Sequence, residues 1–149
     1  MNPEEVFEEL RSHLRGQKVT DRQLAGNSLS VWIATRRDEP AGYTIWFEPS
    51  WHVVGTSGVL AGSRQAQDEE ESTGWQAVSD IIDALLGQIV EDLGRDPVTG
   101  DLELALSGGY RIRTFVTDPR DGFLWRLRDL ATGRRVNGSP AGITVQEAA

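Results

Sequence analysis

Two stretches with the apolar spacing of an amphipathic helix, about 70 residues apart, constrain the fold of this chain most. The first follows Asn2 and Pro3, a capping residue and a residue favoured at a helix start, and Gly16 follows it as a stop signal. The second has capping-box spacing at Thr73 and Gln76 and precedes Gly87. Helical spacing predicts two helices, over residues 3–15 and 73–86, with apolar stripes formed by Val6, Phe7, Leu10 and Leu14, and by Trp75, Val78, Ile81, Ile82, Leu85 and Leu86.

Short segments of strand character follow each helical stretch. Apolar and polar residues alternate within several of them, and Gly, Pro, Asn and Asp separate one segment from the next. We expect strands at residues 19–24, 29–33, 43–47, 51–54 and 59–60, and again at 89–93, 102–106, 110–117, 123–130, 135–136 and 143–145. The sequence therefore predicts an α+β fold.

The turn and cap residues recur in the same order in the two halves of the chain. Leu14-Arg15-Gly16-Gln17 parallels Leu85-Leu86-Gly87-Gln88, and the later matches pair Gly42-Tyr43 with Gly109-Tyr110, Trp51 with Trp125, and Gly62 with Gly138. Offsets of 67–76 residues place the length differences in loops, where insertions cost little. Single matches of this kind arise by chance, but a shared order favours an internal duplication.

We therefore expect one domain, residues 1–149, with repeats over approximately 3–63 and 73–145 joined by a polar segment, 63–72. Two pseudo-symmetric helix-plus-antiparallel-strand units would form one sheet-rich domain with two main helices. The acidic run 68–71 is interpreted as a solvated approach to the second helix, because negative charge is favourable near a helix N-terminus.

The order of motifs from Leu85 to Leu127 resembles small uncharacterised proteins common in actinobacteria. The motifs are the glycine stop after the second helix, Thr99-Gly100-Asp101-Leu102, the Gly109-Tyr110 turn and Trp125-Arg126-Leu127. The resemblance implies an origin and no activity.

Composition excludes several classes of function. The chain has no cysteine, which removes disulfides, thiolate nucleophiles and cysteine-ligated metals. His13 and His52 are its two histidines, and Asp92, Asp96 and Asp101 lack calcium-loop spacing, so we expect no metal and no cofactor. Phosphate-binding glycine loops and nucleophile elbows are also missing. We expect no catalytic residues and a protein that is not an enzyme.

Net charge argues against nucleic acid. The formal charge is −8, whereas nucleic-acid binders present a basic face. Seven arginines could form such a face, but we interpret them as the solvated side of an amphipathic sheet: Arg111, Arg113, Arg120, Arg126, Arg128, Arg134 and Arg135. No apolar run is long enough to span a bilayer, and the N-terminus lacks a signal peptide pattern. We expect a cytoplasmic bacterial protein that binds no membrane.

The five tryptophans are the remaining functional signal. Trp32 and Trp46 alternate against aliphatic residues, so they should lie on the sheet face opposite the core, where exposed aromatics mark a partner surface or a ligand pocket. The alternative is that a helix, the other half or a second subunit covers that face. The candidate binding residues are Trp32, Trp46, Trp51, His52 and Trp125.

These observations favour a non-enzymatic binding or interaction protein. One form is an immunity-type protein that masks a toxin, because an acidic domain can complement a basic active site. The alternative class is a small-ligand sensor or enzyme with a pocket lined by Trp46, Trp51 and His52. We also expect a homodimer with Trp32 and Trp46 at its interface, since two helices cannot cover so many strands.

Overall fold

The computed structural model describes residues 1–67 and 72–148. Helix α1 (Pro3–Leu14) begins as expected, with the Asn2 side chain accepting the Glu5 backbone N–H at 2.9 Å. Helix α2 (Thr73–Asp83) is capped one residue earlier than expected, by Ser72, which accepts the N–H of Trp75. Of the expected linker, residues 63–66 form the short 3-10 helix η1 (Ser63–Ala66), and the acidic run 68–71 lies outside the described residues.

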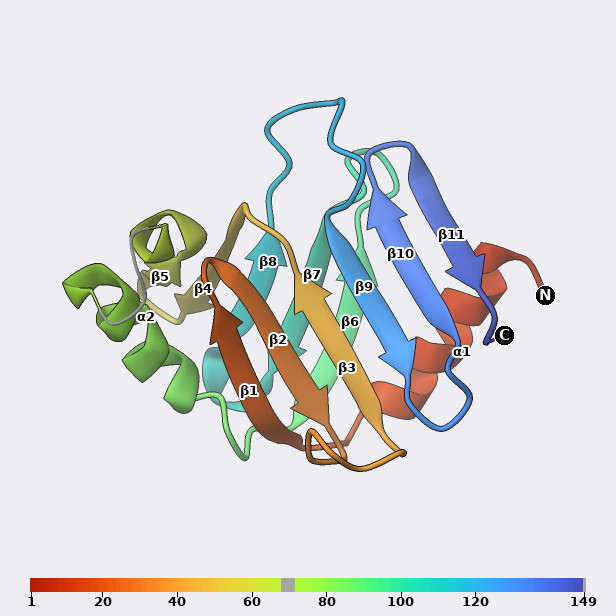
Figure 1. The fold of residues 1–149 in the computed structure, drawn as a ribbon, viewed down its shortest axis with the longest axis horizontal. Helices are drawn as coiled ribbons and strands as arrows, with labels where there is room; N and C mark the ends of the chain where they lie inside the picture. Colours follow the sequence, from red (N-terminus) through yellow and green to blue (C-terminus); the bar gives the residue numbers. More distant parts are fainter. Residues whose placement is uncertain (68–71, 149) are drawn as a thin grey trace.

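Eleven strands form two antiparallel sheets in the described residues (Figure 1). The six-stranded sheet has the order β1-β2-β3-β9-β10-β11, and its strands are Val19–Ala25, Ser28–Ile33, Tyr43–Phe47, Trp125–Asp129, Arg135–Ser139 and Gly142–Gln146. The five-stranded sheet has the order β5-β4-β8-β7-β6, and its strands are Gly58–Gly62, Trp51–Gly55, Arg111–Thr114, Leu102–Leu106 and Val90–Arg95. A second 3-10 turn, η2 (Ser107–Gly109), joins β7 to β8.

Each half of the chain contributes strands to both sheets. The first half places β1–β3 in the six-stranded sheet and β4–β5 in the other, whereas the second half places β6–β8 in the five-stranded sheet and β9–β11 in the six-stranded one. The halves meet where β3 pairs with β9 and, correspondingly, where β8 pairs with β4. Neither sheet is complete without both halves.

Backbone hydrogen bonds after the two helices follow the same symmetry. The Gly16 N–H donates to the Val90 carbonyl at 2.8 Å, and the Gly87 N–H donates to the Val19 carbonyl at 2.8 Å. Both glycines have φ of +84°, a left-handed conformation that glycine adopts without a Cβ penalty. The predicted fold class, two pseudo-symmetric helix-plus-strand units in one sheet-rich domain, is confirmed; descent of the halves from one duplicated segment stays a prediction.

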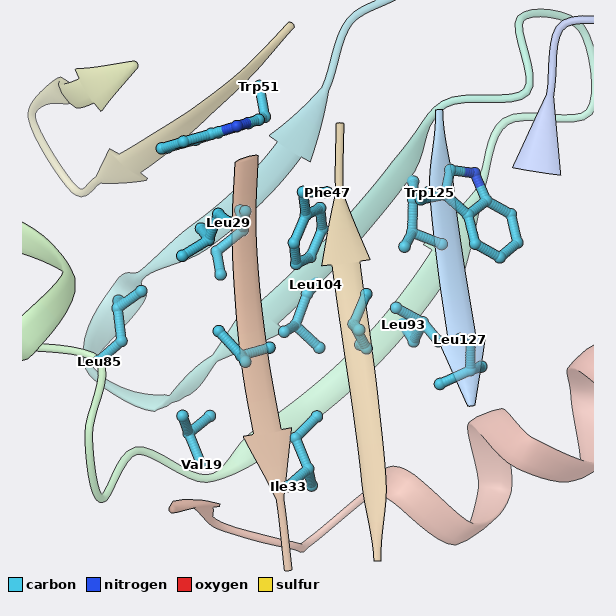
Figure 2. Packing of buried hydrophobic residues seen from close by; sticks show 14 of the residues in the cluster. Val19, Leu29, Ile33, Phe47, Trp51, Leu85, Leu93, Leu104, Trp125 and Leu127 are labelled. Carbon is cyan, nitrogen blue, oxygen red and sulfur yellow. The ribbon is translucent and has the colours of Figure 1, made fainter. Parts of the chain in front are cut away.

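The core lies between the two sheets. Figure 2 shows side chains from both sheets gathered there, among them Leu29 and Phe47 of the six-stranded sheet and Leu104 of the five-stranded one, all with no exposed surface. Helix α1 packs against β6, β10 and β11, and α2 against β1, β5 and η1 (Figure 1). The sheets therefore cover one another's inner faces and the helices close the sides, so in the described part of the chain no helix lies over either outer face.

Candidate functional site

The outer face of the six-stranded sheet brings together residues from both halves. Directly opposed residues of antiparallel strands point to the same side. One row across the sheet runs through Trp32, Thr44, Arg128 and Arg135. The next row runs through Ser30, Trp46, Arg126 and Asn137. We call this surface, with Trp32, Trp46, Arg126, Arg128 and Arg135 as its largest side chains, the tryptophan face.

The alternation that placed the indoles on this face is confirmed by burial. Val31 and Ile45, which lie beside Trp32 and Trp46 in sequence, have no exposed surface and face the core. Trp32 and Trp46 are partly exposed on the opposite side of the same strands. Ser30, directly opposite Trp46 and two residues from Trp32, is 5% exposed.

A groove of about 360 Å³ runs over this face. Short side chains, Ser30 and Thr44, line it together with both indoles. Larger groups from other segments complete the wall: Gln23, Arg37, Arg126, Arg128 and Leu130. The described lining thus combines flat apolar surface with guanidinium groups and contains no carboxylate and no histidine.

Both indoles are held by charged neighbours. The Arg37 guanidinium carbon lies 5.2 Å from the centroid of the Trp32 ring, and its Nε donates to Asp21 at 2.9 Å. The Trp46 Nε1–H donates to a Glu48 carboxylate oxygen. Cation–π contact and a satisfied indole N–H fix the rings while their remaining surface stays accessible.

The arginine cluster, Arg126, Arg128 and Arg135, has no carboxylate partner among the described residues. Nine of the chain's fourteen arginines form an ion pair with a carboxylate, but none of these three does so within the described residues. The Arg126 Nε donates to the Asn137 amide oxygen at 2.7 Å, and its guanidinium lies 5.0 Å from the Phe123 ring centroid. Both contacts position a cation and leave its charge uncompensated.

Arg128 is the most strongly perturbed member of the cluster. Burial, followed by the positive charges of Arg135 and Arg126, lowers the pKa of its guanidinium. Its Nε is buried and has no hydrogen-bond partner among the described residues. A buried donor without an acceptor is costly, so the guanidinium of Arg128 is poorly compensated in the isolated protein.

Two of the predicted site residues, Trp51 and Trp125, belong to the core. Figure 2 shows both indoles among the core side chains, and both are 0% exposed. Their N–H groups donate to backbone carbonyls, Trp51 to Asn27 at 2.8 Å and Trp125 to Gly100 at 2.9 Å. Each is the first residue of the strand that follows the chain's passage from one sheet to the other, and its side chain faces inward. With no accessible surface, neither can touch a partner in this structure.

His52 lies apart from the tryptophan face, on the outer face of the five-stranded sheet. Its ring centroid is 5.0 Å from that of Phe115, and burial together with the Arg113 charge lowers its pKa. The pocket of Trp46, Trp51 and His52 expected from the sequence is therefore not formed. The chain changes sheets between Phe47 and Trp51, which places Trp46 on the outer face of one sheet, Trp51 in the core and His52 on the outer face of the other sheet.

Sequence reasoning missed the role of Arg126 and Arg128. Their spacing was recognised, but they were grouped with Arg111 and Arg113 as a solvated face. The structure places Arg111 and Arg113 on the other sheet, where both pair with Glu103. The signal that could have separated the two pairs is a nearby carboxylate on a predicted neighbouring strand, which Arg111 and Arg113 have and Arg126 and Arg128 lack.

A second hollow, of about 500 Å³, lies on the outer face of the five-stranded sheet. Small residues, Gly94 and Ala105, line part of it, and most of its charged residues form ion pairs, Arg111 and Arg113 with Glu103 and Arg95 with Glu4. Asp92, for example, pairs with Arg11 and Arg15, which hold its pKa well below the usual range. The compensated charges make this hollow a weaker candidate than the tryptophan face.

Asp96 and Asp101 hold local chain segments together. Asp96 accepts the N–H groups of Val98 and Thr99, as expected of a turn residue, and Asp101 accepts from the Thr114 hydroxyl and the Val116 N–H. Across residues 1–67 and 72–148, no three His, Asp or Glu side chains gather as a metal ion would require. Neither described helix has the length and apolar character needed to cross a membrane.

Comparison of the chain with protein-family models, with curated protein sequences and with solved structures gave no match. The functional argument therefore depends on the geometry of the tryptophan face.

Proposed function

We propose that this chain is a non-enzymatic binding protein that holds a protein partner on the tryptophan face. The observation that carries the proposal is the pairing of two partly exposed indoles with unneutralised guanidinium groups on an outer sheet face. Trp and Arg are the residue types that contribute most to protein–protein affinity. Their concentration on one face favours a partner surface over a solvated one.

The lining of the groove supports binding more than catalysis. General acid–base chemistry needs a titratable group near the substrate, and the described lining offers hydroxyl, indole and guanidinium groups instead. An extended sheet face also matches the flat surface of a protein better than the enclosed cavity typical of small ligands.

The charge of the groove favours an acidic contact region on the partner. An immunity-type protein that masks a basic toxin is the second candidate, favoured by the net charge of −8. The two candidates use different surfaces, because Glu4, Glu5, Glu8 and Glu9 are exposed on α1, which packs beside β6, β10 and β11 and does not lie over the outer sheet face. We propose a cytoplasmic site of action for either, which the absence of cysteine supports.

Affinity capture with matched variants tests the proposal. Trp46→Thr removes an indole from the tryptophan face and keeps a residue that favours strands. Arg113→Ala is the control, because Arg113 holds the position on the other sheet that corresponds to Trp46. Arg113 lies opposite His52, just as Trp46 lies opposite Arg126. A partner captured by wild type should be retained by Arg113→Ala and lost by Trp46→Thr, and direct titration of the purified pair should agree.

Melting curves of the variants show whether each is folded before capture is compared. A partner that binds Trp46→Thr as tightly as wild type would contradict the proposal. If loss instead follows charge reversal on α1, such as Glu5→Lys with Glu9→Lys, the immunity-type candidate would replace it.

A further inference from the structure

The arginine cluster places like charges directly opposite one another. Arg128 on β9 and Arg135 on β10 are register partners, and Arg126 lies two residues from Arg128 on the same face. Like charges opposed across an antiparallel pair destabilise the sheet. The isolated protein therefore carries an unfavourable interaction that a bound anion would relieve.

The fold does not require arginines at these positions. By the symmetry of the halves, β4 corresponds to β9 and β5 to β10. The counterparts of Arg126 and Arg128 are His52 and Val54, and Val59, opposite Val54, occupies the place of Arg135. The same strand pairing thus forms with one histidine and two valines, so strand formation does not explain the arginines.

The terminal amino groups of the cluster are the donors left for a ligand. Among the described residues, the Arg128 Nε is buried without an acceptor, and the Arg126 Nε donates to Asn137. The terminal amino groups of these two side chains form no hydrogen bond with a described residue, and both arginines line the groove together with Trp46. Guanidinium groups in this arrangement fit a planar carboxylate, which accepts two parallel N–H groups.

The surroundings of the cluster limit how much negative charge the ligand can carry. Glu48 accepts from Trp46, Asp21 accepts from Arg37, and Glu147 pairs with Arg134. These carboxylates flank the arginines, so a long polyanion such as a nucleic acid would meet repulsion beyond the cluster. One or two acidic side chains would meet the arginines alone.

We infer that Arg126, Arg128 and Arg135 form a subsite for an aspartate or glutamate side chain of the protein partner, next to a shelf formed by Trp46. The inference rests on the proposed function and adds the chemistry that the partner must present: an acidic residue beside an apolar one in an extended segment.

Fluorescence anisotropy of a labelled hexaglutamate peptide at low ionic strength tests the subsite. Hexaglutamine and a mixed-sequence single-stranded DNA are the comparison probes. Hexaglutamate should bind and hexaglutamine should not, because the recognised group is the carboxylate. Arg128→Gln and Arg135→Gln should each weaken binding about tenfold, the loss expected for one charge-assisted hydrogen bond. Arg111→Gln, on the other sheet, should leave binding unchanged.

A thermal melt distinguishes a binding role of Arg135 from a structural one, because loss of a structural residue would lower the melting temperature. Arg135→Gln should leave the melting temperature unchanged or raise it, because it removes the repulsion with Arg128. Absence of hexaglutamate binding up to about 1 mM peptide, or binding that survives both substitutions, would overturn the inference. Tighter, Arg128-dependent binding of the DNA would overturn it in favour of nucleic acid.

The carboxylate subsite can be refuted without refuting the proposed function. If a captured partner depends on Trp46 but binds Arg128→Gln and Arg135→Gln as tightly as wild type, the partner binds the tryptophan face without using the carboxylate subsite.

Discussion

Replacing Gly138 with alanine should destabilise the protein by about 3 kcal/mol. Gly138 on β10 lies directly opposite Trp125, and a Cβ built on it would stand 2.0 Å from Cε2 and 2.2 Å from Nε1 of that indole. The ring cannot move aside freely, because it is fully buried and its Nε1–H donates to the Gly100 carbonyl at 2.9 Å.

The magnitude follows from two costs. Overpacking of a tight core costs about 1–3 kcal/mol. If the indole shifts to relieve the clash, its hydrogen bond to Gly100 is lost and leaves buried groups unpaired, which costs about 1–3 kcal/mol more. For a domain of this size, about 3 kcal/mol corresponds to a fall in melting temperature of roughly 6–12 °C.

Urea unfolding followed by tryptophan fluorescence measures the effect. The control is Gly62→Ala, the glycine that parallels Gly138 in sequence but lies opposite His52 rather than Trp51, where the nearest atom to the new Cβ, the Trp51 carbonyl oxygen, is 3.5 Å away. That contact is ordinary, so the control should cost less than about 1 kcal/mol.

A double variant isolates the clash. Trp125→Phe removes the indole nitrogen and the ring atoms nearest the new Cβ, so Gly138→Ala with Trp125→Phe should be more stable than the two single costs predict. Strict additivity, or a Gly138→Ala variant as stable as Gly62→Ala, would refute the packing argument.

Three further predictions concern charge and association. Arg11, then the Leu93 N–H and Arg15, lower the pKa of Asp92 in the folded state. The contribution of Asp92 to stability is therefore complete above the ordinary aspartate pKa and is lost as pH falls toward the folded-state pKa. Urea midpoints between pH 2.5 and 6, a range that spans the ordinary aspartate pKa of ~3.9, should fall more steeply with acid in wild type than in Asp92→Asn. The homodimer stays a prediction, and a two-fold contact through the tryptophan face would bring two arginine clusters together, so light scattering should show more dimer at high salt than at low salt. A mass of 16.4 kDa at every concentration and ionic strength would exclude the dimer. No single- or double-stranded oligonucleotide should bind at physiological salt, because the net charge of −8 repels phosphate, and micromolar affinity in a gel-shift titration would show otherwise.

Local pattern was sufficient to predict most elements of the fold. Period-two alternation placed Trp32 and Trp46 on the face opposite Val31 and Ile45, because successive residues of a strand point to opposite faces of the sheet. Capping residues and glycine stops located both helices to within three residues. These features depend on contacts a few residues apart.

The site could be predicted only in part, because it is made by a pairing between distant strands. Trp46 meets Arg126 where β3 pairs with β9, and nothing local to either strand specifies that partner. For the same reason Trp51 and Trp125 were expected at a surface: an indole at a strand start has the same sequence pattern whether the strand faces solvent or, as here, another sheet.

The sharing of strands between the halves also governs how the chain can fold during its synthesis. Strand β3 emerges from the ribosome long before β9, so one edge of its hairpin with β2 has no partner until residues 125–129 are made. Strands β4 and β5 likewise wait for β8. Pairings so distant in sequence are slow to form, and an unpaired edge invites association with other chains. The nascent first half is thus the state most in need of protection from aggregation, and the molecule gains its stability in one late step.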